Sequence, residues 1–287
     1  MLNSKGRIQS EITITRFAND VFYILSSTAS ELRDLDWFKN NKKDDENLDI
    51  TNVTNKLGVL VLAGPESRSI LSQITDSELD NEKFPWLKGK EILINDIPVR
   101  ALRINYVGEL GWELHHPMSQ MEKLYDCIID SGKKYNITNF GSYAVNSLRM
   151  EKAYKGWGSE LTGEISLVEA DMKKFYDLSK KNNFIGSNVL ENKMNNILEI
   201  KIVYLEVDAD KADAIGNEPV YYRNKIVGVV TSGAYGFRVN KSLAFAYVMA
   251  NLAEIGNEFE VQILGKKRKA KVLKDMIYDP KNIRLKS

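Results

Sequence analysis

The chain has 287 residues, which accommodates about two domains with ample cores. Its 40 basic and 39 acidic residues nearly cancel, and this balance argues against nucleic acid or a membrane surface as the main partner. A single cysteine excludes an internal disulfide, the apolar run 243–250 is too short to span a membrane, and the first residues lack a signal-peptide core, so we expect a cytoplasmic protein.

The chain is predicted to begin with a β-hairpin and a helix. Residues 11–15 alternate between polar and apolar side chains, and residues 21–25 form a second β-rich run. Thr28, with Glu31 three residues later, has the capping-box pattern of a helix that we expect to continue to Phe38. The polar stretch that follows predicts a loop.

The next part of the chain mixes strands and helices. We expect strands at 57–63, 91–94 and 99–105 and helices at 66–74, at 119–131 (with a second capping box, Ser119 and Glu122) and from Gly141 onward. This order is typical of an α+β fold in which helices pack on a largely antiparallel sheet.

The turn between residues 103 and 114 carries the strongest chemical signal. It combines two glycines, Gly108 and Gly111, with two aromatic and two acidic side chains: Tyr106, Trp112, Glu109 and Glu113. A carboxylate accepts two parallel N–H donors from one ring edge, and aromatic faces stack, so the set suits a flat heterocycle such as a pterin. On the spacing alone, a hairpin with packed aromatics and surface acids is the favoured interpretation.

From about residue 197 the pattern changes to short strands separated by turns. We expect strands at 199–207, 219–222, 225–231, 243–249, 258–264 and 270–273. These indicate a small all-β barrel or sandwich. We place the domain boundary in the polar stretch 191–196, which gives domains at 1–190 and 197–287. The basic run 266–269 is interpreted as a solvated turn after Gly265.

No metal site is predicted. His115 and His116 are adjacent, and neighbouring side chains of a strand point to opposite sides. Cys127 lies among apolar residues at helical spacing, which favours an inert, buried thiol.

Several segments together resemble one family. They are 6–7 with 11–16, 64–68, 106–114, 147–152, 157–158, 169–170, 184–186, 228–233, 241–244 and 246–248. The chain resembles the aminomethyltransferase superfamily, whose central member is the glycine-cleavage T-protein, and is most similar to the folate-binding C-terminal half of dimethylglycine and sarcosine dehydrogenases. The resemblance implies a folate-binding domain, N-terminally incomplete here, followed by a small β-barrel.

The resemblance also implies a function. Tetrahydrofolate would accept a one-carbon unit in the demethylation of an N-methyl amine and leave as 5,10-methylenetetrahydrofolate. A flavoprotein would perform the oxidation, because the chain lacks a G-x-G-x-x-G pattern and so no FAD site is expected. The alternative is a non-catalytic folate-binding or assembly subunit. An iron–sulfur assembly factor is disfavoured, because residues 153–156 lack that group's cysteine motif.

Residue roles follow from the resemblance by position. Glu11 matches the catalytic acid, an aspartate in T-proteins, and the cofactor-binding set comprises Glu113, Tyr106, Arg149, Thr13 and Trp157. Glu113 would grip the pterin edge, Tyr106 would stack, and Arg149 would either contact folate or hold Glu113. Trp157 stands where T-proteins carry a tyrosine. From the residues alone, Glu11 could be a polar strand residue, Tyr106 a packing residue and Arg149 part of an ion pair on the surface of its helix.

Met1 aligns with the interior of the family fold. We therefore expect either a segment supplied by another chain, such as a flavoprotein dehydrogenase subunit, or an inactive fragment. The sequence does not specify the methylated amine.

Overall fold

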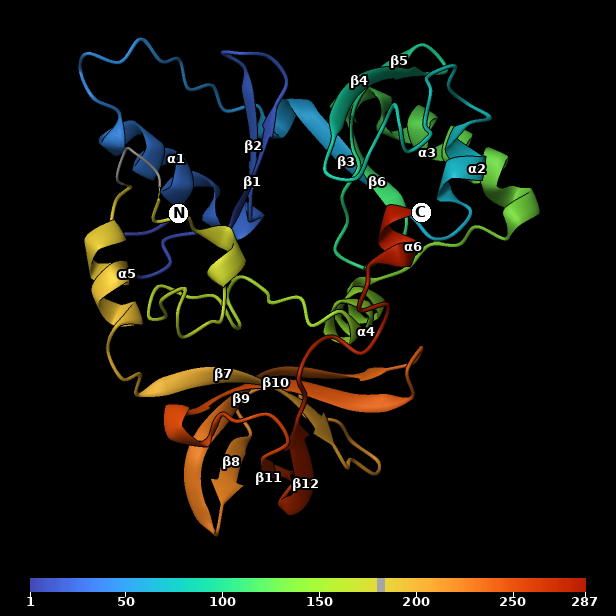
Figure 1. Cartoon of the computed structure of the whole chain (residues 1–287). Helices are drawn as coiled ribbons and strands as arrows, with labels where there is room; N and C mark the ends of the chain where they lie inside the picture. Colours follow the sequence, from blue (N-terminus) through green and yellow to red (C-terminus); the bar gives the residue numbers. More distant parts are fainter. Residues whose placement is uncertain (180–183) are drawn as a thin grey trace. The chain divides into compact units, whose positions relative to one another are not determined.

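The structure, a computed structural model, describes residues 1–179 and 184–287 (Figure 1). Its strands are β1 (Ile12–Arg16), β2 (Phe22–Ser26), β3 (Leu57–Ala63), β4 (Gly89–Ile94), β5 (Ile97–Leu102), β6 (Gly111–Pro117), β7 (Ile200–Val207), β8 (Pro219–Tyr222), β9 (Lys225–Gly236), β10 (Lys241–Met249), β11 (Glu258–Ile263) and β12 (Lys266–Val272). Its α-helices are α1 (Glu31–Asn41), α2 (Ser67–Leu71), α3 (Met121–Gly132), α4 (Ser142–Glu151), α5 (Ser187–Met194) and α6 (Ile283–Lys286).

The chain forms two compact units. The barrel unit contains Met1–Ile12 and Tyr143–Pro280, and the sheet unit contains Thr13–Ser142 and Lys281–Ser287. The predicted α+β class with a C-terminal barrel is confirmed. The sequence domains 1–190 and 197–287 stay a prediction, because the compact units follow spatial proximity and each combines separate stretches of chain.

The sheet unit is built on a four-stranded antiparallel sheet in the order β3-β6-β5-β4. One face packs against α2 and α3, with Trp112 and Leu114 of β6 and Leu124 of α3 fully buried. Strand alternation then assigns Glu113 and His115 to the opposite face. On that face the β1–β2 hairpin covers part of the sheet, since the ring of Tyr23 meets the ring of His115 edge-on at 5.4 Å.

The barrel unit contains a closed six-stranded barrel in the order β10-β7-β12-β11-β8-β9, visible in the lower half of Figure 1. Strand β10 is buried on both faces. Ala244, Ala246 and Val248 point into the barrel, whereas Leu243 and Phe245 belong to a second cluster with Met150 of α4. This double burial explains why the sequence shows a continuous apolar run at 243–250.

Two kinds of local prediction were wrong. Both capping boxes fail, because residues 28–30 and 118–120 form 3₁₀ turns and the helices α1 and α3 begin only at Glu31 and Met121, without a side-chain cap hydrogen bond. The basic run 266–269 is solvated as predicted, but it lies in β12 instead of the turn. Lysine tolerates a strand position when its side chain faces water.

Candidate functional site

Strand β6 places Glu113 on the face of the sheet that lies opposite the core. In the ladder Glu113 stands between Val61 of β3 and Leu102 of β5, and directly opposite residues share a face. Leu102 is buried, whereas Val61 is 43% exposed and the neighbouring Val59 is 44% exposed. The side chain of Glu113 is 24% exposed. The carboxylate therefore borders an open apolar surface.

The turn before β6 is held by one side chain. The amide of Asn105 donates to the carbonyl of Glu109 at 2.6 Å and accepts from the backbone N–H groups of Val107 and Gly108, each at 3.0 Å. Gly108 has a φ of 74°, and a Cβ at Gly111 would lie 2.5 Å from a carbonyl oxygen of β3. Both glycines are thus required by the backbone path.

The two aromatic residues of this turn have different places. Tyr106 keeps 38% of its surface exposed in the loop that leads into β6. Trp112 is fully buried in the core, where the guanidinium groups of Arg68 and Arg103 lie 5.7 and 5.8 Å from its ring centre. Tyr106 is therefore partly exposed, and Trp112 is a core residue.

Glu113 belongs to a chain of polar contacts with two buried residues. Nε2 of His115 lies 3.2 Å from Oε2 of Glu113, and Nδ1 of His115 lies 3.1 Å from the hydroxyl of Tyr23. Burial raises the pKa of Tyr23, and the charge of Glu113 raises it further against the opposing effect of Arg100. His116 faces the other way, toward α3, where its Nε2 lies 3.3 Å from the sulfur of Met121, as predicted from strand alternation.

A hollow of about 1070 Å³ lies beside this chain of contacts in the sheet unit. His115, Arg100 and Glu91 are among its lining residues, and Arg100 pairs with Glu91 at 3.1 Å. Glu113 and Tyr106 are not among them. We therefore place the candidate site on the open face of β6 by its chemistry, with His115 as the residue shared with the hollow.

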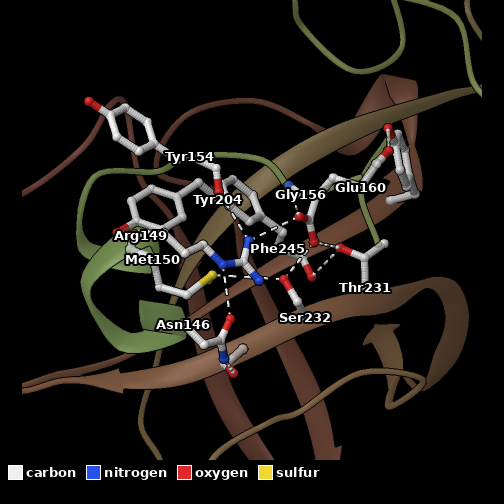
Figure 2. A network of polar contacts seen from close by, with 12 residues as sticks. Asn146, Arg149, Met150, Tyr154, Gly156, Glu160, Tyr204, Thr231, Ser232 and Phe245 are labelled. Carbon is white, nitrogen blue, oxygen red and sulfur yellow. Dashed lines mark hydrogen bonds and ion pairs between the residues drawn. The ribbon is translucent and has the colours of Figure 1, made fainter. Parts of the chain in front are cut away.

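In the barrel unit, Arg149 is buried in a polar network shown in Figure 2. Its Nε donates to Asn146 at 2.9 Å, and its Nη1 donates both to the carbonyl of Tyr154 and to Glu160, each at 3.0 Å. The guanidinium also lies 6.0 Å from the ring centre of Phe245. Arg149 is thus part of a buried ion pair.

Glu160 is the centre of that network. Its fully buried carboxylate accepts hydrogen bonds from the backbone N–H of Gly156 at 2.8 Å, from Thr231 at 2.7 Å and from Ser232 at 2.5 Å, as well as from Arg149 (Figure 2). A buried carboxylate with so many donors is fully compensated. The motif 228–233 therefore serves to join the barrel to the segment that follows α4.

Glu11, Thr13 and Trp157 complete the predicted set. Glu11 and Thr13 are exposed at the start of β1, and Trp157 is half-buried against the cluster around Met150. Neighbouring protein atoms still desolvate the carboxyl of Glu11 and raise its pKa, although the amino group of Met1 acts in the opposite direction. A raised pKa improves a carboxylate as a proton acceptor.

The structure assigns the predicted residues to both units. Glu113, Tyr106 and Thr13 belong to the sheet unit, and Glu11, Arg149 and Trp157 belong to the barrel unit. Their predicted roles stay predictions. Sequence reasoning missed Glu160 and the contacts of His115 with Glu113 and Tyr23. The i, i+2 spacing of Glu113 and His115 on a strand was the available signal for the contact between those two residues.

Among the described residues, no helix is long and apolar enough to cross a membrane, and no group of acidic, histidine or cysteine side chains has the arrangement of a metal site. Cys127 is half-buried, accepts a hydrogen bond from Asn95 at 2.8 Å, and has its pKa raised by burial.

Two family descriptions match successive parts of the chain. Residues 1–180 match the family described as "GCVT N-terminal domain", and residues 201–279 match the "Glycine cleavage T-protein C-terminal barrel domain". The aminomethyltransferase of Thermoanaerobacter sp. (strain X514) is 30% identical over 278 residues, which cover 97% of this chain and 74% of that protein.

The mitochondrial dimethylglycine dehydrogenase of Homo sapiens is 40% identical over 276 residues, or 96% of this chain. The chain spans about a third of that protein, 32%. The crystal structure of the glycine cleavage system aminomethyltransferase T from Bartonella henselae superposes with a TM-score of 0.84 at 19% identity, covering 98% of this chain and 75% of that chain. This last likeness shows the shared fold.

Proposed function

Since this chain belongs to the glycine cleavage T-protein family of folate-dependent aminomethyltransferases, we propose that it is the one-carbon transfer module of an N-methyl amine demethylating system of the dimethylglycine or sarcosine type. The similarity to dimethylglycine dehydrogenase along 96% of the chain carries the proposal. A flavoprotein dehydrogenase is the proposed partner, and 5,10-methylenetetrahydrofolate is the proposed product.

The open face of β6 has the chemistry that a reduced pterin requires. The ionised carboxylate of Glu113 only accepts hydrogen bonds, and the edge of a pterin presents two parallel N–H donors. The exposed surface of Val61 beside it suits the apolar face of the ring, and Tyr106 can stack. Thr13 belongs to the same unit as Glu113 and Tyr106 and completes the proposed binding set there. For Arg149 and Trp157, which belong to the barrel unit, folate binding stays a prediction from the family resemblance.

Tetrahydrofolate, when bound, supplies the amines that take up an iminium carbon and release the demethylated amine and one proton. Glu11 is the residue that we propose receives this proton. Its raised pKa and its exposure suit that role, because the group must both hold a proton and return it to water. Glu113 binds and orients, and takes no part in the proton transfer.

Two substitutions test these roles. Glu113→Gln keeps the size of the side chain but replaces one acceptor oxygen by a donor, so we expect tetrahydrofolate to bind about 100-fold more weakly. Glu11→Gln should leave binding within about threefold and reduce methylene transfer by at least about 100-fold. Calorimetry measures binding, and 5,10-methylenetetrahydrofolate formed from dimethylglycine in the presence of a dimethylglycine dehydrogenase flavoprotein measures transfer.

The outcomes separate the proposal from its alternative. A wild-type chain that binds tetrahydrofolate but does not raise the yield of the methylene product over formaldehyde would be the non-catalytic folate-binding subunit. A wild-type chain that does not bind tetrahydrofolate, with or without the flavoprotein, would overturn both.

A further inference from the structure

The acid of β6 has a buried partner on its own strand. The side chain of His115 is 1% exposed and reaches Glu113 at 3.2 Å through Nε2, while Tyr23 of β2 closes the other side of the ring at 3.1 Å. The three side chains form a continuous chain of contacts from Tyr23 of the hairpin through His115 to the carboxylate of Glu113. All three belong to the sheet unit.

The donor and the acceptor of each contact in this chain follow from simple chemistry. An ionised carboxylate cannot donate, so Nε2 of His115 must carry the proton shared with Glu113. In the neutral ring Nδ1 is then an acceptor, and the hydroxyl of Tyr23 donates to it. Burial raises the pKa of Tyr23, which keeps that hydroxyl proton in place.

We propose that His115 and Tyr23 are positioning residues that hold the carboxylate of Glu113 in the orientation that binds the pterin edge. The inference rests on the proposed function. A glutamate side chain on an open sheet face rotates freely, and binding a ligand would have to fix it. One hydrogen bond from a buried ring fixes Oε2 in advance, and the remaining lone pairs stay directed at the ligand.

Three variants separate positioning from structural support. His115→Gln places an amide N–H where Nε2 stood, so tetrahydrofolate affinity should stay within about threefold of wild type. His115→Phe keeps a ring in the buried space but removes the donor, and affinity should fall about tenfold. Tyr23→Phe leaves the imidazole in place without its orienting hydroxyl, and a smaller loss is expected. Calorimetry measures affinity, and thermal unfolding verifies the fold of each variant.

A double-mutant cycle distinguishes positioning of Glu113 from general damage to the fold. In a Glu113→Gln background, His115→Phe should cause no further loss of affinity, because the group that it positions is already gone. In the ligand-free chain, ¹⁵N NMR of His115 should show the Nε2–H form, and Glu113→Ala should reduce its population.

The failures are distinguishable. If Glu113→Gln weakens binding and His115→Phe does not, the positioning role is wrong and the proposed function stands. A proton on Nδ1 with a bare Nε2 would also overturn it. If the wild-type chain does not bind tetrahydrofolate, the proposed function fails and the positioning role falls with it.

Discussion

Two acids in this molecule have opposite surroundings. Glu160 in the barrel unit is fully buried, and its carboxylate accepts from Arg149, from a backbone N–H and from two hydroxyls. Glu113 in the sheet unit accepts from His115 and keeps 24% of its side chain in solvent. A carboxylate with a complete donor set stabilises a fold, and one fixed on a single side remains able to bind a ligand. Glu113 lies in a segment that carries the family resemblance, 106–114, whereas Glu160 lies outside those segments and only its partners Thr231 and Ser232 belong to one, 228–233.

The largest expected effect is on stability and concerns the buried acid, Glu160. Glu160→Ala leaves the buried guanidinium of Arg149 without its ion-pair partner, and we expect the free energy of unfolding to fall by about 3–5 kcal/mol. Urea unfolding followed by circular dichroism measures it. Arg7→Ala is the matched control, because Arg7 pairs with Glu164 at 2.7 Å with both side chains exposed, and its loss should cost less than about 1 kcal/mol. Equal losses of unfolding free energy in the two variants would contradict the expected difference between a buried and an exposed ion pair.

Two buried tyrosines in the same unit make its stability depend on alkaline pH. Tyr204 donates to the carbonyl of Met150 and Tyr247 to that of Glu160, and burial raises the pKa of both hydroxyls well above the ordinary value. Above about pH 10 the unfolded chain loses these protons first, so stability that is complete below pH 10 falls as the pH rises.

Each tyrosine should contribute a loss of about 1.4 kcal/mol per pH unit above pH 10. Tyr204→Phe and Tyr247→Phe should each make the decline less steep by that amount. Urea unfolding at half-unit steps from pH 8 to 11 measures the slopes. Below pH 9 the slopes of variants and wild type should coincide, and a difference confined to that range would assign the effect to another group.

The contrast between the two acids also shows what the sequence could predict. Strand positions in the barrel followed from β-rich runs between turns, and the opposite directions of His115 and His116 followed from alternation alone. Glu113 was singled out by the residues of its turn, and its binding role was predicted from the family resemblance of that segment. Glu160 was not singled out, because its partners Thr231 and Ser232 are about 70 residues away, and long-range pairing leaves no local pattern.

The predicted helix starts were wrong for a related reason. Thr28 and Ser119 have the right side chains for an N-cap, but the chain tightens into a 3₁₀ turn at both places before the α-helix begins. A capping pattern specifies which hydrogen bonds are available. It does not specify which residue enters the first turn, and packing of the segment decides that.

The smallest expected change in stability gives the sharpest test of the open face. Val61 and Leu62 are neighbours on β3, but Val61 is 43% exposed beside Glu113 and Leu62 is 5% exposed in the core. Val61→Ala should therefore change the free energy of unfolding by no more than about 0.5 kcal/mol, whereas Leu62→Ala should cost about 2–5 kcal/mol.

Binding should respond to Val61→Ala even though folding does not. Removing its methyl groups takes apolar contact away from the face on which the pterin would lie, and we expect tetrahydrofolate affinity to fall about threefold or more. Calorimetry on the same samples measures it. An unchanged affinity in a stable Val61→Ala variant would place the pterin elsewhere than on this face, and a large loss of stability would mean that Val61 is covered by protein. Only a loss of affinity without a loss of stability supports an open binding surface beside Glu113.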